Sequence, residues 1–349
     1  MDRRTFIGAL AGALTATMRA ASAQQQPTKV YRIGFLGTTS MSEFASRVDA
    51  LRAGLRDLGY VEGKNMVIEF RWAEENYNRL PELAAELVSL KVDVLVTHSN
   101  AGASASKQAT TTIPIVMAIG ADAVATGLVE SLARPGGNLT GSTILTPEIS
   151  AKRLALLKEA VPRIARLAIL VRDSPGNRLL LQPTETTARS LNVTVQLFSV
   201  RGANEFESAF SAMSAGRIDA VAVFDDAFLI VNAAEVAELA TRQRLPSTGS
   251  VELAEAGGLI GYGVDALELF RHAAVFVDRI LRGAKPRDLP IEQATKFRLL
   301  VNLRRPRRSA SPFRSRYYCG RTRSFNDGLF GVVRGFRAAR RGRRLSSFR

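Results

Sequence analysis

The chain has one cysteine, Cys319, and two histidines, His98 and His272, among its 349 residues. A single cysteine excludes an intrachain disulfide and a cysteine-based metal cluster. The two histidines lie far apart in the sequence and do not have metal-ligand spacing, so we expect neither a metal site nor a cofactor. No uninterrupted apolar run of about 18 residues follows residue 23, so we expect no membrane span in that part of the chain.

The positive charge of the chain, formally +16, is concentrated near its end. Residues 304–349 hold fifteen arginines and one acidic residue, Asp327, whereas the residues before them hold 33 basic and 31 acidic side chains. The body of the protein is therefore nearly neutral. Taken by itself, the arginine-rich tail with its interleaved aromatic residues favours binding to nucleic acid or to an anionic membrane.

The first 23 residues have the features of an export signal. Arg3-Arg4 precedes a weakly apolar run at 6–16, and Ala21-Ser22-Ala23 forms a small-residue cleavage site. The arginine pair followed by Phe6 favours twin-arginine export, with an ordinary secretory signal as the alternative. We predict cleavage after Ala23 and a periplasmic location.

Residues 92–122 contain the pattern on which the rest of the chain is built. Two short apolar runs, 92–96 and 113–119, flank a helix of small residues at 101–110. Runs of this length separated by helices are typical of parallel strands buried on both faces. The same alternation predicts strands at 30–37, 66–72, 139–144, 167–171, 193–200, 220–224 and 259–264, and helices at 44–58, 80–90, 124–132 and 266–281.

This alternation runs through two consecutive units of similar size that meet near Thr146-Pro147-Glu148. It predicts an α/β protein with two Rossmann-like lobes, each holding a parallel sheet, joined by a hinge. Ligands of open parallel sheets lie beyond the carboxyl ends of the strands. We therefore expect a ligand in the cleft between the lobes.

Eight segments carry a family resemblance: YRIGFLG, GLRDLGYVEGKN, IEFRWAEENYNRLPELAAELV, VDVLVTHSN, TTTIPIVM, SLARPGGNLTG, GLIGYGVD and LPIEQATKFRLLVNL. Together they resemble the substrate-binding proteins of ABC transporters in the tryptophan/tyrosine uptake group. The resemblance covers residues 30–303 and implies a type I periplasmic-binding-protein fold with amino acids as ligands. It implies that residues 30–145 and about 266–288 form lobe 1, and that 146–265 and about 289–303 form lobe 2.

The resemblance ends after Leu303, where arginine-rich residues stand in place of the family's usual ending. A shifted reading frame over the codons of residues 303–313 can encode that ending, and the same frame turns Tyr317-Tyr318-Cys319 into two leucines. We therefore predict that residues 304–349 are a frameshift product that forms a disordered tail. Its arginines would bind polyanions without specificity, so no specific nucleic-acid partner is expected.

An amino-acid ligand, as the resemblance implies, presents a carboxylate and an ammonium group. The carboxylate suits N–H groups and hydroxyls at helix starts, and the ammonium suits a carboxylate just after a strand. The same residue types are ordinary helix N-caps, so one of them alone indicates little. The candidate ligand-binding residues are Thr38, Thr39, Ser40, Ser99, Asn100, Gly120, Asp122, Asp173, Asp225, Asp226 and Ser250.

These features favour a periplasmic substrate-binding protein. It would capture a small amino-acid-like solute, aromatic amino acids included, and deliver it to the permease and ATPase subunits of an ABC transporter. A sensory ligand-binding protein of the same fold and an exported enzyme are the alternatives, which the fold alone does not separate. No nucleophile–base arrangement is evident, so we expect no catalytic residues. We expect a monomer.

Overall fold

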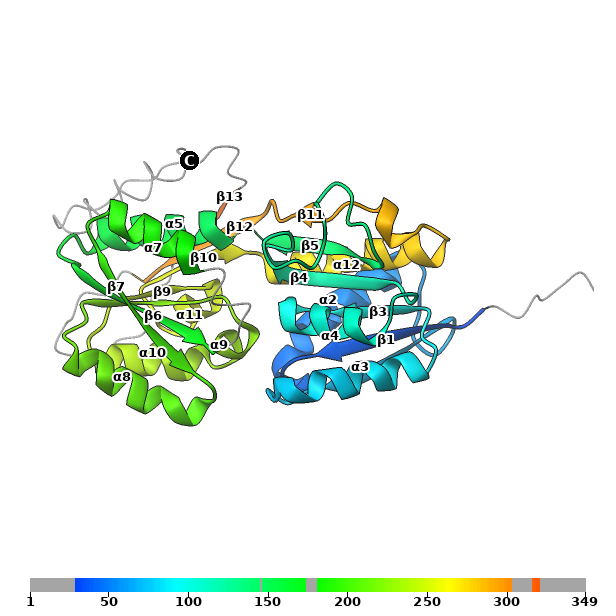
Figure 1. The fold of residues 1–349 in the computed structure, drawn as a ribbon, viewed down its shortest axis with the longest axis horizontal. Coiled ribbons are helices and arrows are strands. Elements are labelled where there is room, and N and C mark those ends of the chain that lie inside the picture. Colours follow the sequence, from blue (N-terminus) through cyan, green and yellow to red (C-terminus); the bar gives the residue numbers. More distant parts are fainter. Residues whose placement is uncertain (1–28, 145, 174–180, 303–315, 321–349) are drawn as a thin grey trace, which may run out of the picture.

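A computed structural model describes residues 29–144, 146–173, 181–302 and 316–320. The chain forms two α/β lobes that lie side by side, each built around one sheet (Figure 1). This confirms the predicted fold class. Within the described residues, no helix is both long enough and apolar enough to cross a membrane. The predicted export signal lies outside them.

The sheet of lobe 1 has six strands, and every neighbouring pair is parallel. The alternate side chains of its strands enter two different cores: Phe35 faces one side of the sheet and the adjacent Leu36 faces the other, both fully buried. Such strands need continuous apolar runs, which is the pattern seen in the sequence. The spatial order is β11 (Glu292–Gln293), β5 (Leu139–Ile144), β4 (Ile115–Ala121), β3 (Val94–Thr97), β1 (Tyr31–Gly37) and β2 (Met66–Trp72).

Helices cover both faces of this sheet. One face packs against α2 (Met41–Asp57) and α12 (Ala266–Leu281), and the other against α3 (Leu80–Ser89) and α4 (Ser99–Ala109). A short 3-10 helix, η1 (Tyr77–Arg79), precedes α3. The placement of α12 on lobe 1, although it follows the whole of lobe 2 in the chain, is the one that the family resemblance implies.

The sheet of lobe 2 has seven strands, of which the last two in the chain run antiparallel to their neighbours. Helices again lie on both faces (Figure 1). The strand order is β13 (Arg316–Gly320), β12 (Phe297–Val301), β10 (Ile260–Val264), β9 (Ser247–Gly249), β8 (Ala220–Val223), β6 (Arg166–Arg172) and β7 (Thr194–Val200). The helices are α5 (Thr146–Ala160), α7 (Leu181–Ser190), α8 (Phe206–Ala215), α9 (Ala227–Val231), α10 (Ala233–Arg242) and α11 (Val251–Glu255), with the 3-10 segment η2 (Ala203–Glu205). A further 3-10 segment, η3 (Pro286–Asp288), follows α12 and lies against β5 of lobe 1.

Strand β13 corrects part of the tail prediction. Residues 316–320 were expected to be disordered, but they pair antiparallel with β12, with Leu299 opposite Tyr318. Without β13, the edge of β12 would present unpaired backbone N–H and C=O groups. An extended segment can pair with such an edge regardless of its side chains. The other residues of the predicted tail lie outside the described part of the chain.

The prediction of a helix at 124–132 is also wrong. The chain there makes one turn that ends at Gly127, whose φ is +70°. The N–H of Leu128 donates to the carbonyl of Ala123, and that of Gly127 to Val124, each at 2.9 Å. These are the bonds of a Schellman motif, which terminates a helix at a left-handed glycine.

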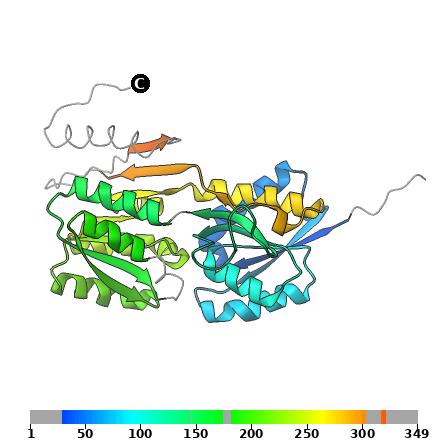
Figure 2. The same ribbon diagram turned by 45° about the horizontal axis from the view of Figure 1, so that its top comes forward.

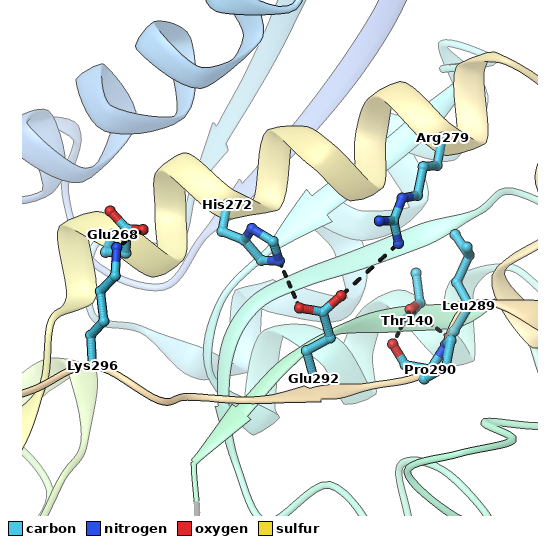
Figure 3. Close-up of polar contacts among 8 residues, drawn as sticks. All are labelled: Thr140, Glu268, His272, Arg279, Leu289, Pro290, Glu292 and Lys296. Carbon is cyan, nitrogen blue, oxygen red and sulfur yellow. Dashed lines mark hydrogen bonds and ion pairs between the residues drawn. The ribbon is translucent and has the colours of Figure 1, made fainter. Parts of the chain in front are cut away.

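The chain passes between the lobes after β5, between β10 and α12, and between β11 and β12 (Figure 2). Residues 289–293, which the sequence analysis places in lobe 2, lie on lobe 1, because β11 pairs with β5. Side chains of lobe 1 hold this segment: Thr140 Oγ1 donates to the Leu289 carbonyl at 2.9 Å, and His272 Nε2 lies 2.8 Å from Glu292 Oε2 (Figure 3). The return to lobe 2 therefore comes after Gln293.

Candidate ligand-binding cleft

A cavity of about 480 Å³ lies between the lobes, at the carboxyl ends of strands from both sheets. Its volume falls in the usual range for small-molecule sites, roughly 300–1,000 Å³. Lobe 1 and α12 contribute Phe44, Arg47, Tyr77, His98, Ser99, Asn100, Ala101, Ser104, Ile119, Gly120, Ala121, Thr126, Leu128, Ile144, Ala266 and Phe270. Lobe 2 contributes Arg153, Asp225, Asp226, Ala227, Ile230, Ser250, Val251, Glu252, Gly263 and Val264.

The structure brings about half of the predicted ligand-binding residues to this cavity. Those that line it are Ser99, Asn100, Gly120, Asp225, Asp226 and Ser250. The others, Thr38, Thr39, Ser40, Asp122 and Asp173, are not among its lining residues.

The predicted residues that do not line the cavity are buried, cap a turn or helix, or lie at the end of a strand. Thr38 and Thr39 follow β1 and are fully buried. Ser40 caps α2 in a capping box, and the Asp122 carboxylate accepts from a backbone N–H three residues later. Asp173 is exposed at the end of β6. Ser40 and Asp122 therefore have the capping role that these residue types commonly have.

His98 forms part of the lobe 1 wall as a neutral ring. Its Nε2 accepts a hydrogen bond from the Thr38 N–H at 3.2 Å, and its ring stacks on Phe44 with 4.0 Å between centroids. Burial, helped by the positive charge of Arg47, lowers the pKa of His98 to about 3. The proton of the neutral ring therefore resides on Nδ1, because Nε2 is the acceptor.

Asn100 lines the cavity, but its amide is engaged within lobe 1. Nδ2 donates to the Ala121 carbonyl at 3.0 Å and to Thr126 Oγ1 at 2.9 Å, while Oδ1 accepts from the Ala121 N–H at 2.8 Å. Gly120 lies beside it, and a Cβ there would lie 2.3 Å from Met117 Sδ, so a larger residue would displace the Met117 side chain. These two residues fix the shape of the wall.

Arg153 is the main cation of the lobe 2 wall, and it is not among the residues predicted from the sequence. Its Nε donates to the Tyr262 carbonyl at 2.6 Å, and its Nη1 forms an ion pair with Asp225 Oδ1 at 3.0 Å. Only 6% of its side chain is exposed. An arginine in the middle of an amphipathic helix looks like a solvated residue in a sequence, so no signal marked it.

Asp226 and Ser250 both cap short helices at the cavity. The Asp226 carboxylate accepts from the Phe228 N–H at 2.9 Å and thereby caps α9. The Ser250 hydroxyl accepts from the Leu253 N–H and caps α11. Both residues nonetheless line the cavity.

An ion pair joins the lobes at one side of the cavity. Arg47 of α2 contacts Glu252 of α11, with 2.7 Å between Nη2 and Oε1. The Arg47 guanidinium also lies over the Phe44 ring, 4.8 Å from its centroid. Both charged residues line the cavity, and neither is among the residues predicted from the sequence.

A second set of contacts joins the lobes through Tyr77. Its hydroxyl donates to Asp226 Oδ1 at 3.3 Å, and its ring lies 4.0 Å from the Arg172 guanidinium. Arg172 Nη2 in turn donates to the Glu75 carbonyl at 2.7 Å. Burial raises the pKa of Tyr77, so its hydroxyl stays protonated and remains a donor. The lobes are thus held together across the cavity in this structure.

Two hinged α/β lobes that enclose a small-molecule cavity at the carboxyl ends of their strands define a ligand-binding protein of the periplasmic-binding class. The chain belongs to the ABC transporter substrate-binding protein family, whose model matches residues 35–308. The sequence resemblance to this family is thereby confirmed.

The chain is also similar to individual proteins and solved structures. A tyrosine-binding protein of Clostridioides difficile is 28% identical over 251 residues, which cover 71% of this chain and 72% of that protein. The structure of an ABC domain from Streptococcus pneumonia in complex with L-Trp is 25% identical, with a TM-score of 0.71, covering 77% of this chain and 92% of that one. A conserved domain protein from Vibrio cholerae has a TM-score of 0.74 at 24% identity, covering 79% and 93% of the two chains.

Proposed function

We propose that this protein binds an aromatic amino acid in the periplasm and delivers it to the permease of an ABC transporter. The single observation that carries the choice of ligand is the lining of the cavity. It combines aromatic and aliphatic side chains, such as Phe44, Phe270 and Val264, with charged groups from both lobes. Apolar surface suits an aromatic ring, and the charged groups suit a zwitterionic head group.

The relatives support this choice of ligand. One is named as a tyrosine-binding protein and another was solved with L-Trp. Export is supported by the arginine pair and the cleavage site in the first 23 residues. Transport is favoured over sensing because the family is one of transporter components.

One experiment tests ligand and location together. The full chain is expressed in a bacterial host, recovered from the periplasm and sequenced from its N-terminus, which we expect to be Gln24. Calorimetry with L-tyrosine, L-tryptophan, L-phenylalanine and L-leucine then compares the ligands. We expect 1:1 binding that is tighter for at least one aromatic amino acid than for L-leucine. Tighter binding of leucine, or no binding of any of the four, would contradict the proposed ligand.

A further inference from the structure

One buried nitrogen of Arg153 has no hydrogen-bond partner in the part of the chain that the structure describes. Nε and Nη1 are engaged by Tyr262 and Asp225, but Nη2 has no hydrogen-bond partner among the described residues. The residue lines the cavity and is only 5% exposed. A guanidinium carries five N–H donors and cannot lose its charge, so the unused N–H groups of Nη2 stay desolvated.

Such a group needs an explanation, because buried donors are almost always hydrogen-bonded in native proteins. A bound molecule with an acceptor group would supply the missing partner. The planar N–H fork of arginine matches the two oxygens of a carboxylate better than it matches other common acceptors. The unpaired Nη2 therefore points to an anionic, planar group on the ligand.

On the proposed function, in which the ligand is an aromatic amino acid, we propose that Arg153 binds the α-carboxylate through Nη2. Asp225 and the Tyr262 carbonyl hold the guanidinium in place before the ligand arrives, which lowers the entropy lost on binding. This assigns the Asp225 carboxylate to Arg153 in the first place, rather than to the ammonium group of the ligand.

The N-terminus of α4 is the competing position for the carboxylate, since Ser99, Asn100 and Ala101 line the cavity. A helix N-terminus acts as roughly half an elementary charge, and the whole charge of the Arg153 guanidinium is partly offset by Asp225. Arg153, however, has a desolvated donor that no other described residue satisfies. The observations therefore favour Arg153.

The test compares ligands that differ only in the carboxylate. Calorimetry on the full chain measures L-tyrosine against tyramine and L-tryptophan against tryptamine, for the wild type and for Arg153→Met. We expect the wild type to bind each amino acid about 10–100-fold more tightly than its amine, as one charge-assisted hydrogen bond predicts. In Arg153→Met the ratio should fall to about one or invert, because Asp225 then repels the carboxylate.

Arg47→Met is the matched control, because Arg47 is the other arginine that lines the cavity and is paired across the cleft. It should weaken the amino acid and the amine alike and leave their ratio unchanged. Arg153→Lys, which keeps the charge but not the fork, should lower the ratio and decides the matter if Arg153→Met does not fold by circular dichroism.

The outcomes distinguish a wrong ligand class from a wrong role for Arg153. A wild-type protein that binds none of the four probes overturns the proposed ligand class, and this assignment with it. If Arg153→Met still binds each amino acid more tightly than its amine by the wild-type ratio, the role of Arg153 alone is overturned. If Arg47→Met instead loses the preference for the amino acid over the amine, the carboxylate lies at Arg47, and the role of Arg153 is again overturned.

Discussion

At the scale of single residues, His98 shows how burial fixes a charge state in the cavity wall. The pKa of His98 is about 3 in the folded protein and near 6.5 in an unfolded chain. Between these values the unfolded state binds one more proton than the folded state. The stability gained by keeping the ring neutral is therefore present above about pH 6.5 and is lost as the pH falls.

We predict that this group makes the protein about 2 kcal/mol less stable at pH 5 than at pH 7, at about 1.4 kcal/mol per pH unit below 6.5. Urea unfolding of His98→Gln should lack that part of the pH dependence, since glutamine offers an acceptor to the Thr38 N–H but does not titrate. His272→Gln, which changes the only other histidine, should retain it. Equal pH dependence in the wild type and His98→Gln would refute the argument.

Some residues of the cavity could be predicted from the sequence and others could not. Asp225, Asp226 and Ser250 were predictable as cavity residues because parallel strands end at one edge of a sheet and the residues after them gather there. Arg153 and Glu252 were not, because they lie within helices whose rotation about their axes depends on packing. A sequence gives the spacing of a helix face but does not say which partner that face meets.

At the scale of elements, the contact between α2 and α12 depends on close approach at Gly54. A Cβ at this position would lie 2.4 Å from the Arg271 carbonyl oxygen and 2.8 Å from Ala274 Cβ. These atoms belong to the facing helix and its backbone, which cannot yield as a flexible side chain can. The glycine is therefore needed for packing, although glycine weakens an isolated helix.

Gly54→Ala should consequently destabilise the protein by about 1–2 kcal/mol. The overpacking cost of roughly 1–3 kcal/mol exceeds the gain of up to about 1 kcal/mol in helix propensity. Denaturant unfolding measures the change. Ser46→Ala, on the exposed face of the same helix, should alter stability by no more than about 0.5 kcal/mol. A Gly54→Ala variant more stable than the wild type would show that the helices can move apart at little cost.

The elements themselves were largely predictable. The long amphipathic helix at 266–281 has the bounds expected from its spacing, and the strands of lobe 1 lie within about two residues of theirs. Strand β9, with three residues, is too short to show a period. Strand β11 has two residues, and its place on lobe 1 depends on contacts with β5 and α12 that the local sequence does not encode.

At the scale of the whole molecule, the position of the two lobes determines whether Arg47 and Glu252 can meet. They lie 205 positions apart in the chain, one on each lobe, and contact at 2.7 Å across the cavity. Separation of the lobes about the crossing segments would break this contact. The pair therefore favours the closed arrangement, in which a ligand is enclosed, over an open one.

We predict that Arg47→Ala and Glu252→Ala each weaken the affinity for L-tyrosine about fivefold, as expected for a partly buried ion pair contributing about 1 kcal/mol. The double alanine variant should lose little more than either single variant, because both remove the same interaction. The charge-swapped variant Arg47→Glu with Glu252→Arg should recover part of the affinity, and calorimetry at low salt measures all four. Additive losses in the double variant would mean that the two residues act on the ligand separately and do not hold the lobes together.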